Sequence, residues 1–191
     1  MSFFNDLHSS TKILWVIICL AISLGFEQIN PLFLWKRKRG PHFKVNFFLL
    51  CTTMLISSFF SLVALRVYDW TQANDFGFFQ WTSLSLWIQL IISVLFLDFV
   101  AQYCIHYLLH NVPFMWRLHM VHHSDLQVDA STGTRHHPGD FILREIFSCL
   151  AIFLLSIPVP FYLFYRFITV ATTYFTHANI ALPLRIDKGL S

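Results

Sequence analysis

Five histidines lie close together in the second half of the chain, between residues 106 and 123. They form the patterns H-Y-L-L-H and H-M-V-H-H, separated by eight residues. Side chains three and four positions apart share one face of a helix. Several neutral imidazoles on one face are typical of a transition-metal site. We therefore predict metal ligation by His106, His110, His119, His122 and His123.

The residues inside these patterns narrow the choice of metal. Zinc hydrolases use H-E-x-x-H, in which the glutamate is the general base, and neither pattern here contains a carboxylate. Structural zinc usually recruits thiolates, and Cys104 is the only cysteine nearby. A histidine-rich site with few carboxylates fits redox iron best, although spacing alone leaves zinc and copper open. The alternative is that each histidine is a hydrogen-bonding core residue of a membrane protein.

The composition predicts an integral membrane protein. The chain has 191 residues, of which 56% are hydrophobic and only 12% charged, and its mean hydropathy is +0.59. Soluble domains carry about 25% charged residues. No two glycines come within two residues of each other, which argues against a nucleotide-binding loop. The single basic block, residues 36–39, argues against nucleic acid as a partner.

The apolar residues form long runs that predict an all-α, multi-pass bundle of transmembrane helices. We expect helices over residues 13–35, 45–67 and from 83 to the first histidines. The apolar region 141–177 contains a turn signal, Ile157-Pro158-Val159-Pro160. We predict that it is a helical hairpin, which returns His177 to the side of the membrane where His123 lies.

The basic block sets the expected orientation. If residues 36–39 are cytoplasmic, as the positive-inside rule favours, the histidine cluster also reaches the cytoplasmic side. We expect two regions. Residues 1–82 would supply N-terminal transmembrane helices with a basic cytoplasmic loop, and residues 83–191 would carry the chemistry.

Three smaller predictions concern single residues. Asn111-Val112-Pro113 should break the helix between the two histidine patterns, so that their faces turn toward each other. Asp98, about two turns before His106, should accept a hydrogen bond from a ligand histidine; the alternative is a helix-packing residue. His8 and His42 are isolated, and we expect both at the surface.

Three stretches together resemble the fatty acid hydroxylase / sterol desaturase superfamily of membrane histidine-rich di-iron oxygenases. The longest, residues 98–125, reads D-F-V-A-Q-Y-C-I-H-Y-L-L-H-N-V-P-F-M-W-R-L-H-M-V-H-H-S-D. Residues 130–138 read A-S-T-G-T-R-H-H-P and are similar to the family's Arg-x-His-Pro element. Residues 176–180 read T-H-A-N-I and are similar to a family stretch that contains one more histidine.

The resemblance implies an oxidoreductase of lipid biosynthesis with two irons at the cytoplasmic membrane face. These would activate O2 to hydroxylate or desaturate a C–H bond of a fatty acyl or sterol-like lipid, with electrons from an external donor. The ligand positions implied are the five clustered histidines and His177, while His137 would bind metal or orient a ligand. The resemblance implies no role for His136.

The family has a final H-x-x-H-H cluster, and this chain ends at Ser191 before that pattern appears. We therefore expect a C-terminally truncated domain whose second iron is under-coordinated, or one that receives the missing histidines from another chain. The alternative function is an inactive metal-binding membrane protein.

Overall fold

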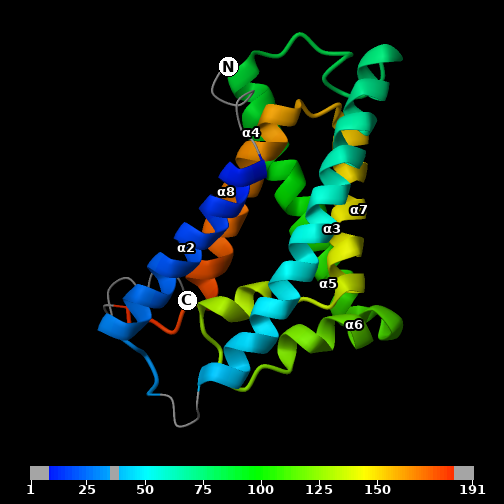
Figure 1. The fold of residues 1–191 in the computed structure, drawn as a ribbon. Helices are drawn as coiled ribbons and strands as arrows, with labels where there is room; N and C mark the ends of the chain where they lie inside the picture. The colour runs from blue at the N-terminus through cyan, green and yellow to red at the C-terminus, as the bar shows by residue number, and fades with distance from the viewer. Residues whose placement is uncertain (1–8, 35–38, 183–191) are drawn as a thin grey trace.

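The computed structural model describes residues 9–34 and 39–182, and this part of the chain is all-α, as predicted (Figure 1). His8 and most of the basic block lie outside the described residues. The elements are α2 (Ser9–Ile29), α3 (Arg39–Ala73), α4 (Leu86–Asp98), the π-helix η1 (Phe99–Cys104), α5 (Ile105–Asn111), α6 (Pro113–His123), the short 3-10 helix η2 (Ala130–Thr134), α7 (Pro138–Leu155) and α8 (Val159–His177).

Two helical stretches among the described residues are long and apolar enough to cross a membrane, Gly40–Ala73 and Leu86–Asn111. A span needs about 20 residues, and these have 34 and 26. Their large apolar side chains are mostly turned outward, as in Leu55, Leu95 and Trp87, which are 74%, 65% and 77% exposed. An apolar outer surface is what a bilayer requires, so the composition and the fold agree.

The first two helices differ from their predicted limits. Helix α2 ends at Ile29, not near residue 35. The residue before a proline avoids helical geometry, and the backbone around Pro31 pairs with the segment around Ile180. The Leu32 amide donates to the Asn179 carbonyl at 3.2 Å. Helix α3 instead continues to Ala73, beyond the predicted end at residue 67.

The hairpin of α7 and α8 runs along much of the length of the bundle, with its turn toward the upper end in Figure 1. Its turn contains Ser156 in the left-handed conformation, with φ of 57°. The amides of Phe78 and Phe79 donate to the carbonyls of Leu154 and Leu155, at 3.1 and 3.0 Å. The turn therefore lies beside the loop after α3, at the end opposite the histidines. The predicted return of the chain to the histidine side is confirmed.

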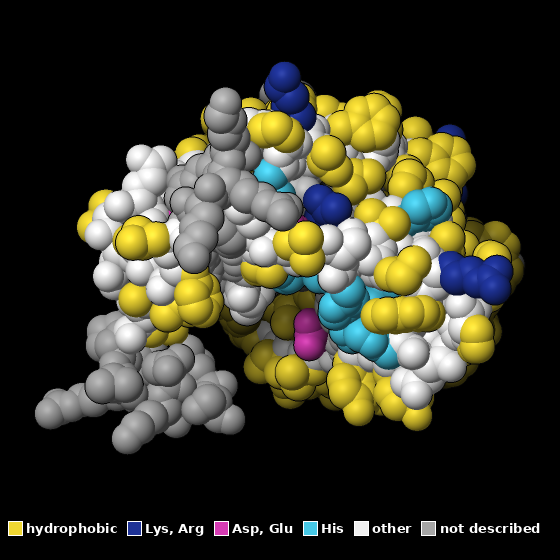
Figure 2. All heavy atoms as spheres, turned by 90° about the horizontal axis from the view of Figure 1, so that it is seen from below, with side chains coloured by type: hydrophobic (Ala, Val, Ile, Leu, Met, Phe, Trp, Pro, Cys, Tyr) yellow, Lys and Arg dark blue, Asp and Glu magenta, His cyan; other side chains and the backbone are white. Residues whose placement is uncertain are grey.

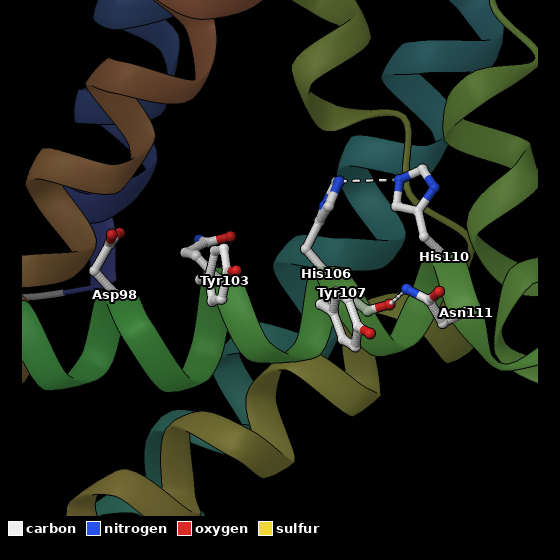
Figure 3. A pocket seen from close by; sticks show the side chains of 7 residues that line it. Asp98, Tyr103, His106, Tyr107, His110 and Asn111 are labelled. Carbon is white, nitrogen blue, oxygen red and sulfur yellow. Dashed lines mark hydrogen bonds between the residues drawn. The ribbon is translucent and has the colours of Figure 1, made fainter.

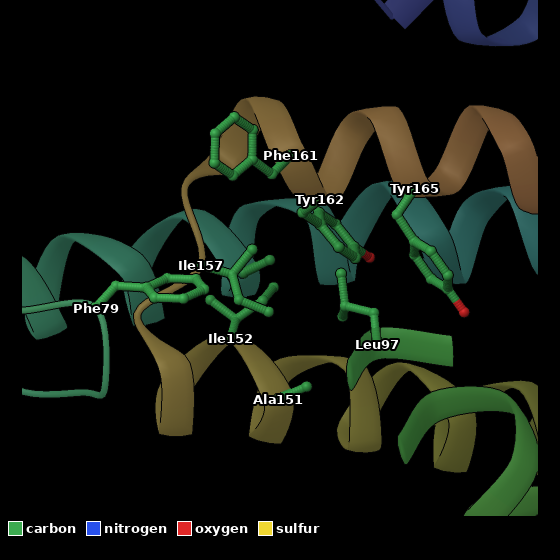
Figure 4. Packing of buried hydrophobic residues seen from close by; sticks show 9 residues of the cluster. Phe79, Leu97, Ala151, Ile152, Ile157, Phe161, Tyr162 and Tyr165 are labelled. Atoms are coloured by element: carbon green, nitrogen blue, oxygen red, sulfur yellow. The ribbon is translucent and has the colours of Figure 1, made fainter. Parts of the chain in front are cut away.

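The hydrophobic core lies in the half of the bundle that includes this turn (Figure 4). Leu97 of α4 packs there against side chains of α7 and α8. An ion pair also lies between these two helices, because Arg166 Nη2 is 2.9 Å from Oε1 of the buried Glu145. Tyr162 donates to the same carboxylate at 3.1 Å, and Arg166 donates to Ser57 of α3 at 3.0 Å. Buried charges in a membrane protein need such partners.

Helices α4, η1 and α5 form one continuous rod that ends at Asn111. Val112 is extended, with φ of −96° and ψ of 115°, and Pro113 opens α6. Proline is well tolerated in a first helical turn, where its missing N–H is not needed. The predicted break is confirmed, and it folds α6 back so that its histidines face those of α5.

Candidate metal centre

The first group of histidines, here called the α5–α6 set, comprises His106, His110, His119 and His123. Their Nε2 atoms converge. The distances are 3.0 Å between His106 and His110, 3.2 Å between His110 and His123, and 3.2 Å between His119 and His123. One potential ligand atom from each residue lies within 4.8 Å of all the others. The predicted ligation by these four residues thus has the required geometry.

These separations suit a common metal ion. Histidine nitrogens bind first-row metals at about 2.0–2.1 Å, which places neighbouring ligand atoms about 3.0–3.4 Å apart in octahedral or tetrahedral geometry. His119 is fully buried, whereas the other three are exposed on one side. Figure 2 shows histidines gathered at this end of the molecule, with an acidic side chain beside them. The set is therefore open to an exogenous ligand.

Asp140 of α7 fixes the ring of His119. Its Oδ2 lies 2.8 Å from His119 Nδ1, and Arg144 Nε donates to its Oδ1 at 2.9 Å. Burial alone would raise the pKa of Asp140, but hydrogen bonds from His119 and His136 and the Arg144 guanidinium lower it below its usual range. The ionised carboxylate accepts the Nδ1 proton of His119. The lone pair of His119 Nε2 is then directed at the centre of the set.

The second group, here called the three-element set, comprises His122 of α6, His136 of the segment after η2, and His177 at the end of α8. The Nε2 atoms of His122 and His177 are 3.3 Å apart. The rings of His122 and His136 stack in parallel, with centroids 5.0 Å apart. His177 Nδ1 donates to the Thr173 carbonyl at 2.8 Å, which leaves its Nε2 as the acceptor. The predicted placement of His177 beside the cluster is confirmed.

Burial favours the neutral form of three of these histidines, His122, His123 and His136. Burial, and then the neighbouring His136 and His177, lower the pKa of His122 to about 2. Burial also lowers the pKa of His123 and His136. His122 Nδ1 is buried with no hydrogen-bond partner among the described residues. A metal ligand must be the neutral imidazole. The lowered pKa values of these three histidines therefore favour binding of a metal ion over protonation.

Two predicted residues lie elsewhere. Asp98 is exposed and, among the described residues, no histidine hydrogen-bonds to it; the carboxylate beside a ligand histidine is Asp140. His137 caps the start of α7, where its Nδ1 accepts from the Gly139 amide at 3.0 Å. His137 thus caps a helix, whereas its neighbour His136 stacks on the ring of His122.

The prediction that His42 is a surface residue is wrong. Its side chain is only 11% exposed, and its Nε2 lies 2.9 Å from Asp125. Its Nδ1 lies 3.6 Å from Asp129. The isolated position of His42 in the sequence gave no signal of these partners, because both come from a segment more than eighty residues away.

A groove of about 500 Å³ runs along the rod beside the α5–α6 set (Figure 3). Asp98, His106 and His110 point to the same side of the helix in that view. Tyr103 and Tyr107 are 65% and 59% exposed. The groove therefore connects the apolar outer surface of the bundle with two potential metal ligands. Its lining consists of Asp98, Gln102, Tyr103, His106, Tyr107, His110 and Asn111.

Comparison with known proteins gives one match. The family model described as fatty acid hydroxylase matches residues 90–190, which is just over half of the chain. This region includes every histidine of both sets. No curated protein and no solved structure matches the chain.

Proposed function

The chain belongs to the fatty acid hydroxylase family of di-iron lipid-modifying oxidoreductases, and we propose that it hydroxylates or desaturates an unactivated C–H bond of a fatty acyl or sterol-like lipid. The observation that carries the proposal is the convergence of four Nε2 atoms beside a groove that opens to the apolar surface. When bound, a pair of irons would supply O2 activation.

The two sets would hold the two irons. His106, His110, His119 and His123 would bind one ion. His122, His136 and His177 would bind the second, which would give His136 a role that the family resemblance did not assign to it. Asp140 would serve both positions, because its Oδ2 faces His119 Nδ1 at 2.8 Å and His136 Nδ1 at 3.3 Å. One carboxylate would thus orient a ring in each set.

The lipid would approach sideways from the bilayer. The groove runs along the membrane-spanning stretch Leu86–Asn111 and reaches the exposed rings of His106 and His110. The rings of Tyr103 and Tyr107 would pack against an acyl chain, while the polar residues of the lining would face the lipid head group or the metal centre. We propose that residues 83–191 form the hydroxylase-like region, with residues 1–82 as additional membrane helices. The basic loop between α2 and α3 would place the histidines on the cytoplasmic side.

Electrons would come from an external donor. Each turnover of hydroxylation consumes O2, two electrons and two protons, and yields the alcohol and water. The sequence contains no nucleotide-binding glycine pattern and no paired cysteines, and redox cofactors usually need such motifs. A soluble or membrane-bound reductase would supply the electrons.

Metal content and product mass together test the proposal. The full-length protein, loaded with Fe²⁺ in lipid bilayers, should bind two irons per chain. With a reductase system and ¹⁸O2, extracted lipid should gain one ¹⁸O if it is hydroxylated or lose two hydrogens if it is desaturated. The His119→Ala variant is the negative control. Two irons with no oxidised lipid would reject the lipid reaction, and one metal or none would favour an inactive metal-binding membrane protein.

A further inference from the structure

The three-element set depends on a segment that is not helical along most of its length, residues 124–136. His122 and His123 immediately precede this segment, and His136 is its last residue. A metal site requires its ligand atoms to be held within a few tenths of an ångström. An irregular segment cannot supply that rigidity by itself, so its contacts with neighbouring helices matter.

Asn46 of α3 makes three hydrogen bonds to this segment. It is completely buried. Its Nδ2 donates to Ser131 Oγ at 2.8 Å, and its Oδ1 accepts from Arg135 Nη1 at 3.1 Å. Its carbonyl also accepts from Thr134 Oγ1 at 3.4 Å. One side chain of a membrane-spanning helix thus joins η2 to the residue that precedes His136.

Arg135 carries this link to the end of α6. Its Nε donates to the Val121 carbonyl at 3.0 Å, and its Nη2 donates to Ser124 Oγ at 3.1 Å. These two acceptors flank His122 and His123 in the sequence. The guanidinium therefore connects the Val121 backbone and the Ser124 side chain, which lie on either side of these histidines, with Asn46, and Arg135 itself is next to His136 in the sequence.

A second link lies one helical turn before Asn46. His42 faces Asp125 at 2.9 Å and Asp129 at 3.6 Å. Asp125 also accepts from Thr132 Oγ1 at 2.7 Å, and Asp129 caps η2 by accepting from the Ser131 amide at 2.9 Å. Residues four apart share a helix face, so His42 and Asn46 form one continuous polar strip on α3.

We propose that Asn46, acting through Arg135, is a positioning residue for the three-element set. This inference rests on the proposed di-iron function. Asn46 lies outside the region 90–190 that matches the family, and it touches none of the histidines in the two sets. Its part is to set the distance between His122 and His136. The α5–α6 set depends on it much less, because α5, α6 and the Asp140 carboxylate hold that set, and His123, its one member beside an acceptor of Arg135, is fixed by helix α6.

The test is selective loss of one metal. Full-length protein in lipid bilayers is titrated with Co²⁺, and bound metal is counted per chain while the visible absorption of the cobalt is recorded. Wild type should bind two ions. Asn46→Leu keeps the branching of the side chain and removes its three hydrogen bonds, to Ser131, to Arg135 and to His42 Nε2 at 3.3 Å, so we expect affinity at the second position to fall about 10- to 100-fold. The first ion and its spectrum should be unchanged.

Two further variants separate positioning from general stability. Asn46→Asp keeps the acceptor for Arg135 and should restore the second ion. Asn74→Leu changes an exposed asparagine just beyond the other end of α3, whose Nδ2 only donates to the Trp70 carbonyl, and should bind two ions.

The outcomes discriminate clearly. If Asn46→Leu binds two ions with wild-type affinity and spectrum, the positioning role is wrong while the di-iron proposal stands. If both ions are lost together, Asn46 supports the bundle as a whole and the inference is also wrong. If wild type itself binds fewer than two ions, the proposed function fails. Should Asn46→Leu not fold, Arg135→Lys replaces it, because lysine cannot reach Asn46 and the α6 carbonyl together.

Discussion

The two histidine sets are built in different ways. Four residues of the α5–α6 set lie on two consecutive helices joined by one extended residue, Val112. The three-element set draws His122, His136 and His177 from separate parts of the chain. In the first set, helix periodicity fixes the side chains. In the second, contacts distant in sequence do so, including those from Asn46 and from Glu27.

Glu27 illustrates the difference. This fully buried residue of α2 accepts hydrogen bonds from the Ala130 amide at 2.6 Å and from the Asn179 amide at 2.9 Å. It therefore ties η2 to the backbone two residues beyond His177. A site assembled from local periodicity needs only its own helices, whereas a site assembled across elements needs the whole bundle. We expect the second metal to be the more easily lost.

The largest effect should follow His119→Ala. This residue is buried and belongs to the α5–α6 set, and its ring is oriented by a hydrogen bond to Asp140. Removing a ligand should weaken binding of the first ion by more than the about 10- to 100-fold typical of an outer partner, and lipid oxidation should be abolished. Isothermal titration with Co²⁺ measures the affinity. Retention of two ions at wild-type affinity would rule out His119 as a ligand.

A neighbouring pair sharpens the contrast within the three-element set. His136→Ala should remove the second ion and leave the first. His137→Ala, the matched control, should keep both ions and lower the free energy of unfolding by about 1 kcal/mol through loss of the α7 cap. Metal analysis and thermal unfolding distinguish the two. The assignment of His136 would be refuted by the opposite pattern.

A pair of carboxylates tests which one supports the ligands. Asp140→Asn should weaken metal binding about 10-fold or more, because the amide cannot accept from His119, His136 and Arg144 as the carboxylate does. Asp98→Asn should leave metal affinity unchanged. Competition with a chelator gives both affinities. Equal losses in the two variants would restore the sequence-based role of Asp98.

The smallest effect concerns packing behind His177. A Cβ at Gly133 would lie 2.8 Å from Thr173 Cγ2 and 3.4 Å from His177 Nδ1. Gly133→Ala should cost about 1–3 kcal/mol of unfolding free energy and affect the second ion more than the first. Gly25→Ala has nothing within 4 Å and should be neutral or stabilising. Thermal unfolding with and without metal would show this, and equal melting temperatures for both variants would contradict it.

Sequence patterns predicted all four residues of the α5–α6 set, because the spacing of the histidines shows which of them share a helix face. They also predicted the break at Pro113 and the return of His177 through the α7–α8 hairpin. They assigned the outer carboxylate to Asp98, which is near in sequence, although Asp140 holds that place. The stretch H-H-P-G-D could have predicted the role of Asp140, because this residue lies four positions after His136, on the first turn of α7.

The sequence by itself determined the all-α architecture, the membrane character, the family and the local half of the metal centre, because composition and helical periodicity are properties of neighbouring residues. Only the tertiary structure decided that His136 and not His137 lies against His122, and that Glu27, His42 and Asn46 contact the segment that leads to His136. Those choices depend on which backbone and side-chain groups of distant helices meet in the folded bundle, and no spacing along the chain encodes that.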